Sequence, residues 1–87
     1  KPPVAIMEML RVLLKHVAEE NNIAPRLIAS ADDLERLAND DDAPIRALTG
    51  WRREVFGATA LRLKNGEIAL AVKHGRIRLI TEVDAMN

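Results

Sequence analysis

The sequence predicts a mainly α-helical fold, a compact bundle of about four to five helices followed by a C-terminal β-hairpin at residues 67–82. Apolar residues recur at spacings of three and four over residues 4–21, which is the pattern of an amphipathic helix. After Gly66 the apolar period changes to strict alternation, which indicates strands. The expected organisation is a linker remnant at 1–3, a helical domain at 4–65, a hairpin or helical extension at 66–82, and a tail at 83–87.

The first helix is expected to span residues 4–21 and to lie at the centre of the bundle. Pro2 and Pro3 precede it, and Asn21-Asn22 is a plausible end. Its apolar arc is broad, which suggests contact with more than one other element. The side chains expected to face the core are Ile6, Met7, Leu10, Leu13, Leu14 and Val17.

A second helix is expected to begin at Ser30. Asp33 stands three residues later, so the two residues form a capping box. Its buried stripe is expected to comprise Leu34, Leu37 and Ala38. In the preceding connection Pro25 disfavours helical angles at the residue before it. The residues expected to anchor this connection in the core are Ile23, Leu27 and Ile28.

The acidic run NDDDAP interrupts the chain again, and a short helix is expected after it. Asp42 can cap this helix, with Pro44 in its first turn. Ile45 and Leu48 would then be directed inward.

The stretch LTGWRREVFG, residues 48–57, opens a helix that is expected to run from Thr49 to about Lys64. Gly57 divides this helix in an alternative interpretation. The aromatic part of an otherwise aliphatic core is expected to come from Trp51, Val55 and Phe56 with their neighbours.

The last segment, GEIALAVKHGRIRLITE, is predicted to be a hairpin with a two-residue turn at His74-Gly75. In that register Val72 faces Ile77 and one apolar face runs across both strands. The competing interpretation extends the preceding helix through two alanines and ends it at Gly75.

The composition is that of a small globular domain, and a cytoplasmic location is expected because the absence of cysteine fits a reducing compartment. Of 87 residues, 48% are hydrophobic, 30% are charged and 2% are aromatic. Cysteine is absent, which excludes disulfides and thiolate chemistry. No apolar run approaches the roughly 20 residues that cross a bilayer, so no membrane partner is expected. The Lys-Pro-Pro start is interpreted as an excised linker, so we expect the chain to be a piece of a longer protein.

The charges are segregated along the chain although the formal net charge is zero. Residues 1–42 carry five basic and nine acidic side chains, whereas residues 43–79 carry eight basic and two acidic ones. A cationic half can attract phosphate locally. Alternatively, the two halves pair with each other.

No catalytic centre and no metal site is predicted. The acidic cluster lacks the spacing of a calcium loop, and capping and solubility explain its members, which are Asp32, Asp33, Glu35, Asp40, Asp41 and Asp42. The two histidines have no second ligand at helical spacing. No nucleophile elbow or phosphate-cradling glycine loop is present.

Anion-binding candidates are found instead in the cationic half. Arg52 and Arg53 stand in the first turn of a predicted helix, where free backbone N–H groups also favour phosphate. In the alternative, one of the carboxylates at positions 40–42 folds back and neutralises them. In the hairpin, Lys73 and Arg76 would lie opposite each other with Arg78 on the same face, and an anionic partner would relieve their repulsion. A solubilising strand edge is the alternative there.

The segments IAPRLIASADDLERLA and LTGWRREVFGATAL resemble the helicase-and-RNase-D C-terminal (HRDC) domain over roughly residues 5–65. The resemblance favours the C-terminal region of bacterial ribonuclease D over the equivalent domain of RecQ-type helicases. Gly50 and Gly57 are only seven residues apart, whereas the helicase versions usually have a longer insert between these glycines. The tail after Gly66 departs from the usual helical ending of the family.

The resemblance implies a noncatalytic HRDC-like helical bundle that binds RNA weakly through phosphates and helps to position it. The parent would be a ribonuclease D-like 3′–5′ exoribonuclease that trims structured RNA such as tRNA precursors. Its divalent metal ions would belong to a separate exonuclease domain, and no cofactor is expected in this fragment. The residues expected to contact RNA are Arg46, Arg52, Arg53, Arg62, Lys73, Arg76 and Arg78.

The alternative function is that of a structural or protein-interaction module. The hairpin or the long helix would then pack on the parent's exonuclease domain, or on a second copy to form a homodimer, without touching RNA. A lone two-stranded hairpin needs support from another element, which favours this alternative.

Overall fold

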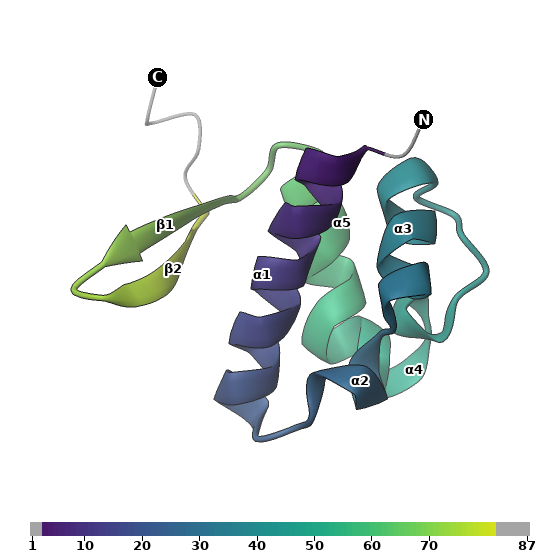
Figure 1. Cartoon of the computed structure of the whole chain (residues 1–87), viewed down its shortest axis with the longest axis horizontal. Coiled ribbons are helices and arrows are strands. Elements are labelled where there is room, and N and C mark those ends of the chain that lie inside the picture. Colours follow the sequence, from purple (N-terminus) through teal and green to yellow (C-terminus); the bar gives the residue numbers. More distant parts are fainter. Residues whose placement is uncertain (1–2, 82–87) are drawn as a thin grey trace.

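Helix α1 (Val4–Asn21) packs against several of the other helical elements, as Figure 1 shows. The computed structural model describes residues 3–81, so residues 1–2 of the predicted linker, residue 82 of the predicted hairpin and the predicted tail at 83–87 lie outside the described part. The helical elements that follow are α2 (Pro25–Ile28), α3 (Ala31–Asn39), the 3₁₀ helix η1 (Arg46–Leu48), α4 (Gly50–Arg52), the π-helical segment η2 (Arg53–Gly57) and α5 (Ala58–Lys64). The strands are β1 (Ala69–Lys73) and β2 (Arg76–Ile80). The predicted fold class, a mainly α bundle with a C-terminal hairpin, is confirmed.

Helix α1 has the predicted boundaries. It ends where Asn22 adopts the left-handed conformation, with φ at 54°, and donates its N–H to carbonyls of the last turn. The predicted core stripe is buried at Leu10, Leu13, Leu14 and Val17, and Met7 packs against it. The prediction for Ile6 was wrong, because 41% of this residue is exposed.

The capping box of α3 is confirmed. Ser30 Oγ accepts from the Asp33 N–H at 3.1 Å, and Asp33 Oδ2 accepts from the Ser30 N–H at 2.9 Å. The predicted stripe of α3 is buried. In the preceding connection, Ile28 enters the core from the single turn of α2, while Leu27 points outward with 53% of its surface exposed. The expectation that Leu27 anchors this connection was therefore wrong, since a single turn offers only one inward position here.

The short helix after the acidic run exists, but Asp42 does not cap it. Helix η1 begins at Arg46, and the residue at its cap position is Ile45, which offers no side-chain oxygen. The acidic run instead forms its own turn, in which the Asp42 N–H donates to Asp40 Oδ1 at 2.9 Å. Ile45 and Leu48 are buried as predicted.

Elements α4, η2 and α5 form one unbroken helical run from residue 50 to residue 64. Gly57 does not divide this run; it lies at the end of the π-helical segment and is buried against η1. Phe56 and Ala60 are fully buried, as expected. The prediction that Trp51 joins the core was wrong, because 42% of it is exposed in the first turn, where Arg52 covers its ring.

The hairpin has the predicted register, with Val72 paired to Ile77 and Leu70 to Leu79. The turn residues His74 and Gly75 both have positive φ, 54° and 74°, as a type I′ turn requires. The competing helical extension is therefore wrong. Ile68, just before β1, is buried in the core, whereas the hairpin itself projects away from the bundle (Figure 1).

Within residues 3–81, no helix combines the length and the apolar character that crossing a membrane requires.

We predict that Gly57→Ala destabilises the fold. A Cβ at this position would overlap the carbonyl oxygen of Ala47, which belongs to the backbone of η1. Alanine gains about 1 kcal/mol of helix propensity over glycine. We expect the overlap to outweigh this gain and to lower the free energy of unfolding by about 2 kcal/mol, measured by urea denaturation.

Thr59→Ala is the matched control, since position 59 lies in the same helical run and is only half-buried. It should change the free energy of unfolding by no more than about 0.5 kcal/mol. A Gly57→Ala variant that is as stable as the original chain would contradict the close approach of η1 and η2.

Candidate nucleic-acid interface

The structure distributes the predicted RNA-contacting cations over three places. One group surrounds η1 and the start of α4, Arg62 lies on α5, and the remaining group lies on the hairpin. In Figure 1 the hairpin and α4 lie on opposite sides of α1. The first group comprises Arg46, Arg52 and Arg53, and the hairpin group comprises Lys73, Arg76 and Arg78. These residues therefore do not form one continuous binding patch.

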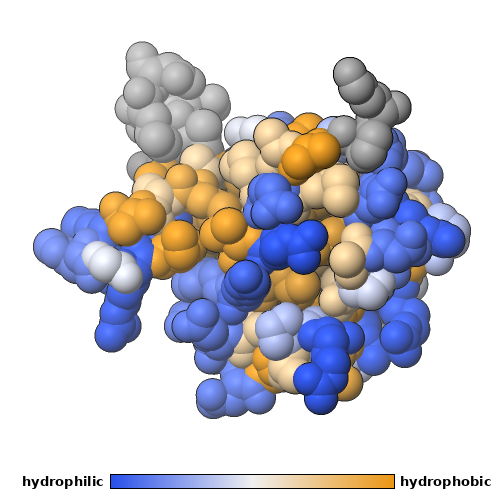
Figure 2. Space-filling model, viewed as in Figure 1, coloured by the Kyte–Doolittle hydropathy of each residue, from blue (hydrophilic) through white to orange (hydrophobic). Residues whose placement is uncertain are grey.

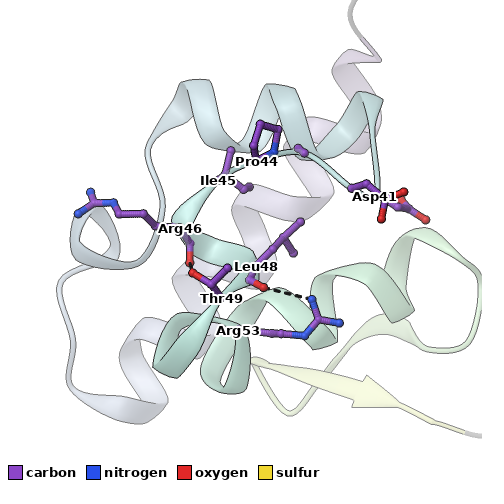
Figure 3. Close-up of a pocket in the computed structure, with 9 residues that line it drawn as sticks. Asp41, Pro44, Ile45, Arg46, Leu48, Thr49 and Arg53 are labelled. Atoms are coloured by element: carbon purple, nitrogen blue, oxygen red, sulfur yellow. Dashed lines mark hydrogen bonds between the residues drawn. The ribbon is translucent and has the colours of Figure 1, made fainter.

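A surface depression of about 470 Å³ lies beside η1. Arg46 and Arg53 both line it, but Figure 3 shows that their guanidinium groups extend in opposite directions. Arg53 Nη1 donates to the carbonyl oxygen of Leu48 at 3.2 Å, which fixes this side chain across the end of η1. The depression thus has two separate cations on its rim, and they do not form a single anion-binding site.

Arg52 is half-buried and links two helices. Its Nε donates to the carbonyl oxygen of Leu27, at 2.8 Å, and its guanidinium carbon lies 4.5 Å from the centroid of the Trp51 ring. The first contact satisfies a backbone carbonyl in the single turn of α2, and the second is a cation–π contact. Arg52 therefore has a structural role in addition to its charge.

No ion pair joins Arg46, Arg52 or Arg53 to a carboxylate among residues 3–81. The alternative in which the acidic run neutralises the arginines at 52 and 53 is accordingly not what the structure shows. The acidic run pairs instead with Lys64, the last residue of α5. Lys64 Nζ lies 2.6 Å from Asp41 Oδ1 and also donates to the carbonyl oxygen of Leu37.

The Lys64–Asp41 contact closes the acidic turn onto the end of α5. The Lys64 hydrogen bond, with a second one from Asn65 at 3.3 Å, lowers the pKa of the Asp41 carboxyl from its usual 3.8. Because Lys64 is occupied in this way, it is a structural cation. Within residues 3–81, the acidic and basic halves of the chain thus form one ion pair with each other, while most of the cations remain on the surface.

Arg62 and the hairpin cations differ in their surroundings. Arg62 Nε lies 3.6 Å from Glu67, across the turn that ends α5, and both side chains are largely exposed. Lys73 and Arg76 are opposite each other, as predicted. Such a pair of like charges repels mildly, and no carboxylate within residues 3–81 forms an ion pair with either side chain.

A second depression, of about 670 Å³, separates the hairpin from α1. Arg76 and Arg78 line it on the hairpin side, and Glu19 and Glu20 line it on the helix side. Opposite charges therefore face the same opening without direct contact, and this opening sets the hairpin apart from the body of the bundle.

The divalent metal ions that the HRDC resemblance assigns to a parent exonuclease do not fit this part of the chain. Among residues 3–81, no group of three or more His, Cys, Asp or Glu side chains is arranged to hold a metal ion. Four acidic side chains of α3 and its following turn accept backbone hydrogen bonds or form ion pairs instead: Asp32, Asp33, Asp40 and Asp41.

The fold and its surface define a small helical bundle with an appended hairpin and with cations spread over several faces. The chain is similar to proteins named ribonuclease D: it is 52% identical over 81 residues, 93% of its length, to that of Granulibacter bethesdensis. It is 52% identical over 73 residues, 84% of its length, to that of Nitrobacter hamburgensis, and 37% identical over 79 residues, 91% of its length, to that of Zymomonas mobilis. It spans about a fifth of the length of these curated relatives. No family model and no solved structure matches the chain.

We predict that the Lys64–Asp41 contact makes stability sensitive to acid. The pKa of Asp41 is lower in the folded chain than its usual 3.8. The stabilisation that the Asp41 carboxylate gives to the folded state is therefore fully present above pH 3.8, and it is lost as the pH falls through the folded pKa. Urea denaturation over a series of acidic pH values should show a smaller loss of stability for Asp41→Asn than for the original chain.

Asp42→Asn removes the same charge from the neighbouring position and serves as the control for net charge, because no ion pair involves Asp42 within residues 3–81. Identical pH profiles for the Asp41→Asn variant and the original chain would contradict the contact.

Proposed function

We propose that this chain is a noncatalytic, HRDC-like accessory region of a cytoplasmic ribonuclease D-like 3′–5′ exoribonuclease, and that it helps to position structured RNA such as tRNA precursors. The observation that carries the proposal is the 52% identity over 93% of the chain to part of a protein named ribonuclease D. The relatives described above bear that name, which favours a ribonuclease parent over a RecQ-type helicase. The metal ions of such an enzyme would be held outside this chain.

The cations that remain on the surface support an RNA contact. Arg46 and Arg53 are exposed beside η1, and Lys73, Arg76 and Arg78 are exposed on the hairpin. Guanidinium and ammonium groups release counterions when they neutralise phosphates, which gives affinity without sequence preference. Two cationic groups on opposite sides of α1 can contact separate stretches of a folded RNA. Each group alone would bind weakly, as an accessory region requires.

We predict that binding of a fluorescein-labelled structured RNA, followed by anisotropy at increasing KCl, weakens as salt rises. Arg46→Gln with Arg53→Gln should reduce affinity and flatten the plot of log K against log[salt] by about one unit for each phosphate that is no longer neutralised. The triple variant Lys73→Gln, Arg76→Gln and Arg78→Gln should do the same independently.

The matched control is Arg11→Gln with Arg36→Gln. It removes two arginines that are already paired, at 3.6 Å with Glu8 and at 3.0 Å with Asp32. This control should leave the salt slope unchanged. If it weakens binding as much as the Arg46/Arg53 double variant does, only net charge matters and the assigned residues are wrong.

A second candidate function, a protein-interaction module, is favoured by the apolar face of the hairpin. Val72 is 72% exposed, and Leu79, on the same face of the hairpin, is also exposed. Figure 2 shows apolar surface over the hairpin, with hydrophilic residues at its tip and lower edge. An isolated hairpin is marginally stable, so burial of this face against a second copy, or against the exonuclease domain of the parent, would stabilise it.

We predict that, if the partner is a second copy, the chain dimerises with increasing concentration and Val72→Asp abolishes the dimer. The reason is that the substitution places a carboxylate in the apolar face. Analytical ultracentrifugation measures the change. Lys73→Glu, on the opposite face of the same strand, controls for added negative charge and should leave the dimer in place. A chain that stays monomeric throughout excludes the self-association.

A further inference from the structure

Trp51 is the only tryptophan of the chain, and tyrosine is absent. The only other aromatic residue, Phe56, is fully buried. The fold therefore buries its phenylalanine and leaves 42% of its tryptophan exposed in the first turn of the helical run. This exposure is not required by the packing of the core, because the helical run is anchored by Phe56, Ala60 and Leu63.

The ring of Trp51 is held by its neighbour. The guanidinium carbon of Arg52 lies 4.5 Å from the ring centroid, and Arg52 Nε is itself fixed to the carbonyl oxygen of Leu27 at 2.8 Å. One face of the indole is thus covered by a cation that is tied to α2. With Arg52 over one face of the ring, 42% of Trp51 is still exposed, and an indole held in this way can serve as a preformed stacking surface.

The surroundings of the ring are cationic. Arg53 follows directly in the chain and is exposed, with one of its donors bonded to Leu48 and others left for a ligand. Neither Arg52 nor Arg53 forms an ion pair with a carboxylate within the part of the chain that the structure describes. A flat apolar ring beside unneutralised guanidinium groups matches a ligand that has both an aromatic face and a negative charge.

We infer that Trp51 is a stacking platform for one unpaired nucleobase of single-stranded RNA, with Arg53 contacting an adjacent phosphate. This inference rests on the proposed RNA-binding function and narrows it to an unpaired segment of the RNA. Bases in a duplex interior have no free face, whereas those of a single strand stack on an exposed aromatic ring without sequence preference. A protein partner would not require the combination of an open indole face and unneutralised arginines.

The single tryptophan also provides the measurement. We expect an oligoadenylate of about eight nucleotides to quench Trp51 fluorescence at low salt, because a stacked base contacts the indole directly. Inorganic polyphosphate, which has charge but no bases, should bind through the arginines with much less quenching. A blunt RNA duplex of the same length should bind more weakly than the single strand.

Affinity is then measured by anisotropy of a labelled oligoadenylate and, for polyphosphate, by competition. Trp51→Leu should weaken oligoadenylate binding at least about fivefold and leave polyphosphate binding unchanged, while Trp51→Phe should retain part of the affinity that the leucine variant lacks. Circular dichroism and thermal melting establish that the variants fold, as an exposed position allows.

The outcomes separate the two proposals. Equal binding of oligoadenylate by the original chain and Trp51→Leu, or binding of the duplex as tight as that of the single strand, would overturn the stacking platform and leave the phosphate contacts standing. No binding of any of the three anions at low salt would overturn both. A Trp51 emission that changes with protein concentration, and not with oligoadenylate, would assign the ring to a protein contact instead.

Discussion

The close approach of two backbones, at Gly57 and Ala47, is the constraint on which the arrangement of the bundle depends. The π-helical segment that ends at Gly57 packs directly on η1, and a side chain at position 57 would not fit between them. This contact fixes the helical run from residue 50 to residue 64 against the segment that precedes it. It thereby directs Phe56 into the core and sets the position from which the hairpin departs. Such π-helical segments are rare and occur mostly as single turns inside a longer α-helical run, as here.

The elements that could be predicted from sequence are those that local patterns specify. The periodic stripe of α1, the Ser30–Asp33 capping box and the alternation around His74-Gly75 each determine their own geometry, and each is found as expected. The predictions of burial that were wrong share another cause. Ile6, Leu27 and Trp51 are large apolar residues at helical positions, and periodicity alone does not show where a helix extends beyond its neighbours.

The candidate interface was less predictable than the fold for a related reason. Whether a cation is available depends on partners that are distant in sequence. Lys64 is engaged by Asp41, 23 residues away, and Arg52 by a carbonyl 25 residues away. The absence of cysteine, the absence of catalytic motifs and the segregation of charge could all be determined from the sequence. The exposure of Trp51 beside Arg52 could not. A tryptophan with adjacent arginines is the only signal in the sequence that points to such a site.

Within residues 3–81 each hairpin strand pairs only with the other, so its outer edge has no strand partner. Lys73, Arg76 and Arg78 lie on the face opposite Leu70, Val72, Ile77 and Leu79. Positive charge on an edge strand opposes association with another edge, because the two copies repel. An RNA that neutralised these cations would lower that repulsion. If the hairpin both binds RNA and self-associates, the two equilibria would be thermodynamically linked, and each would strengthen the other. RNA binding would then change how strongly two hairpins repel each other, without any change in the conformation of the hairpin.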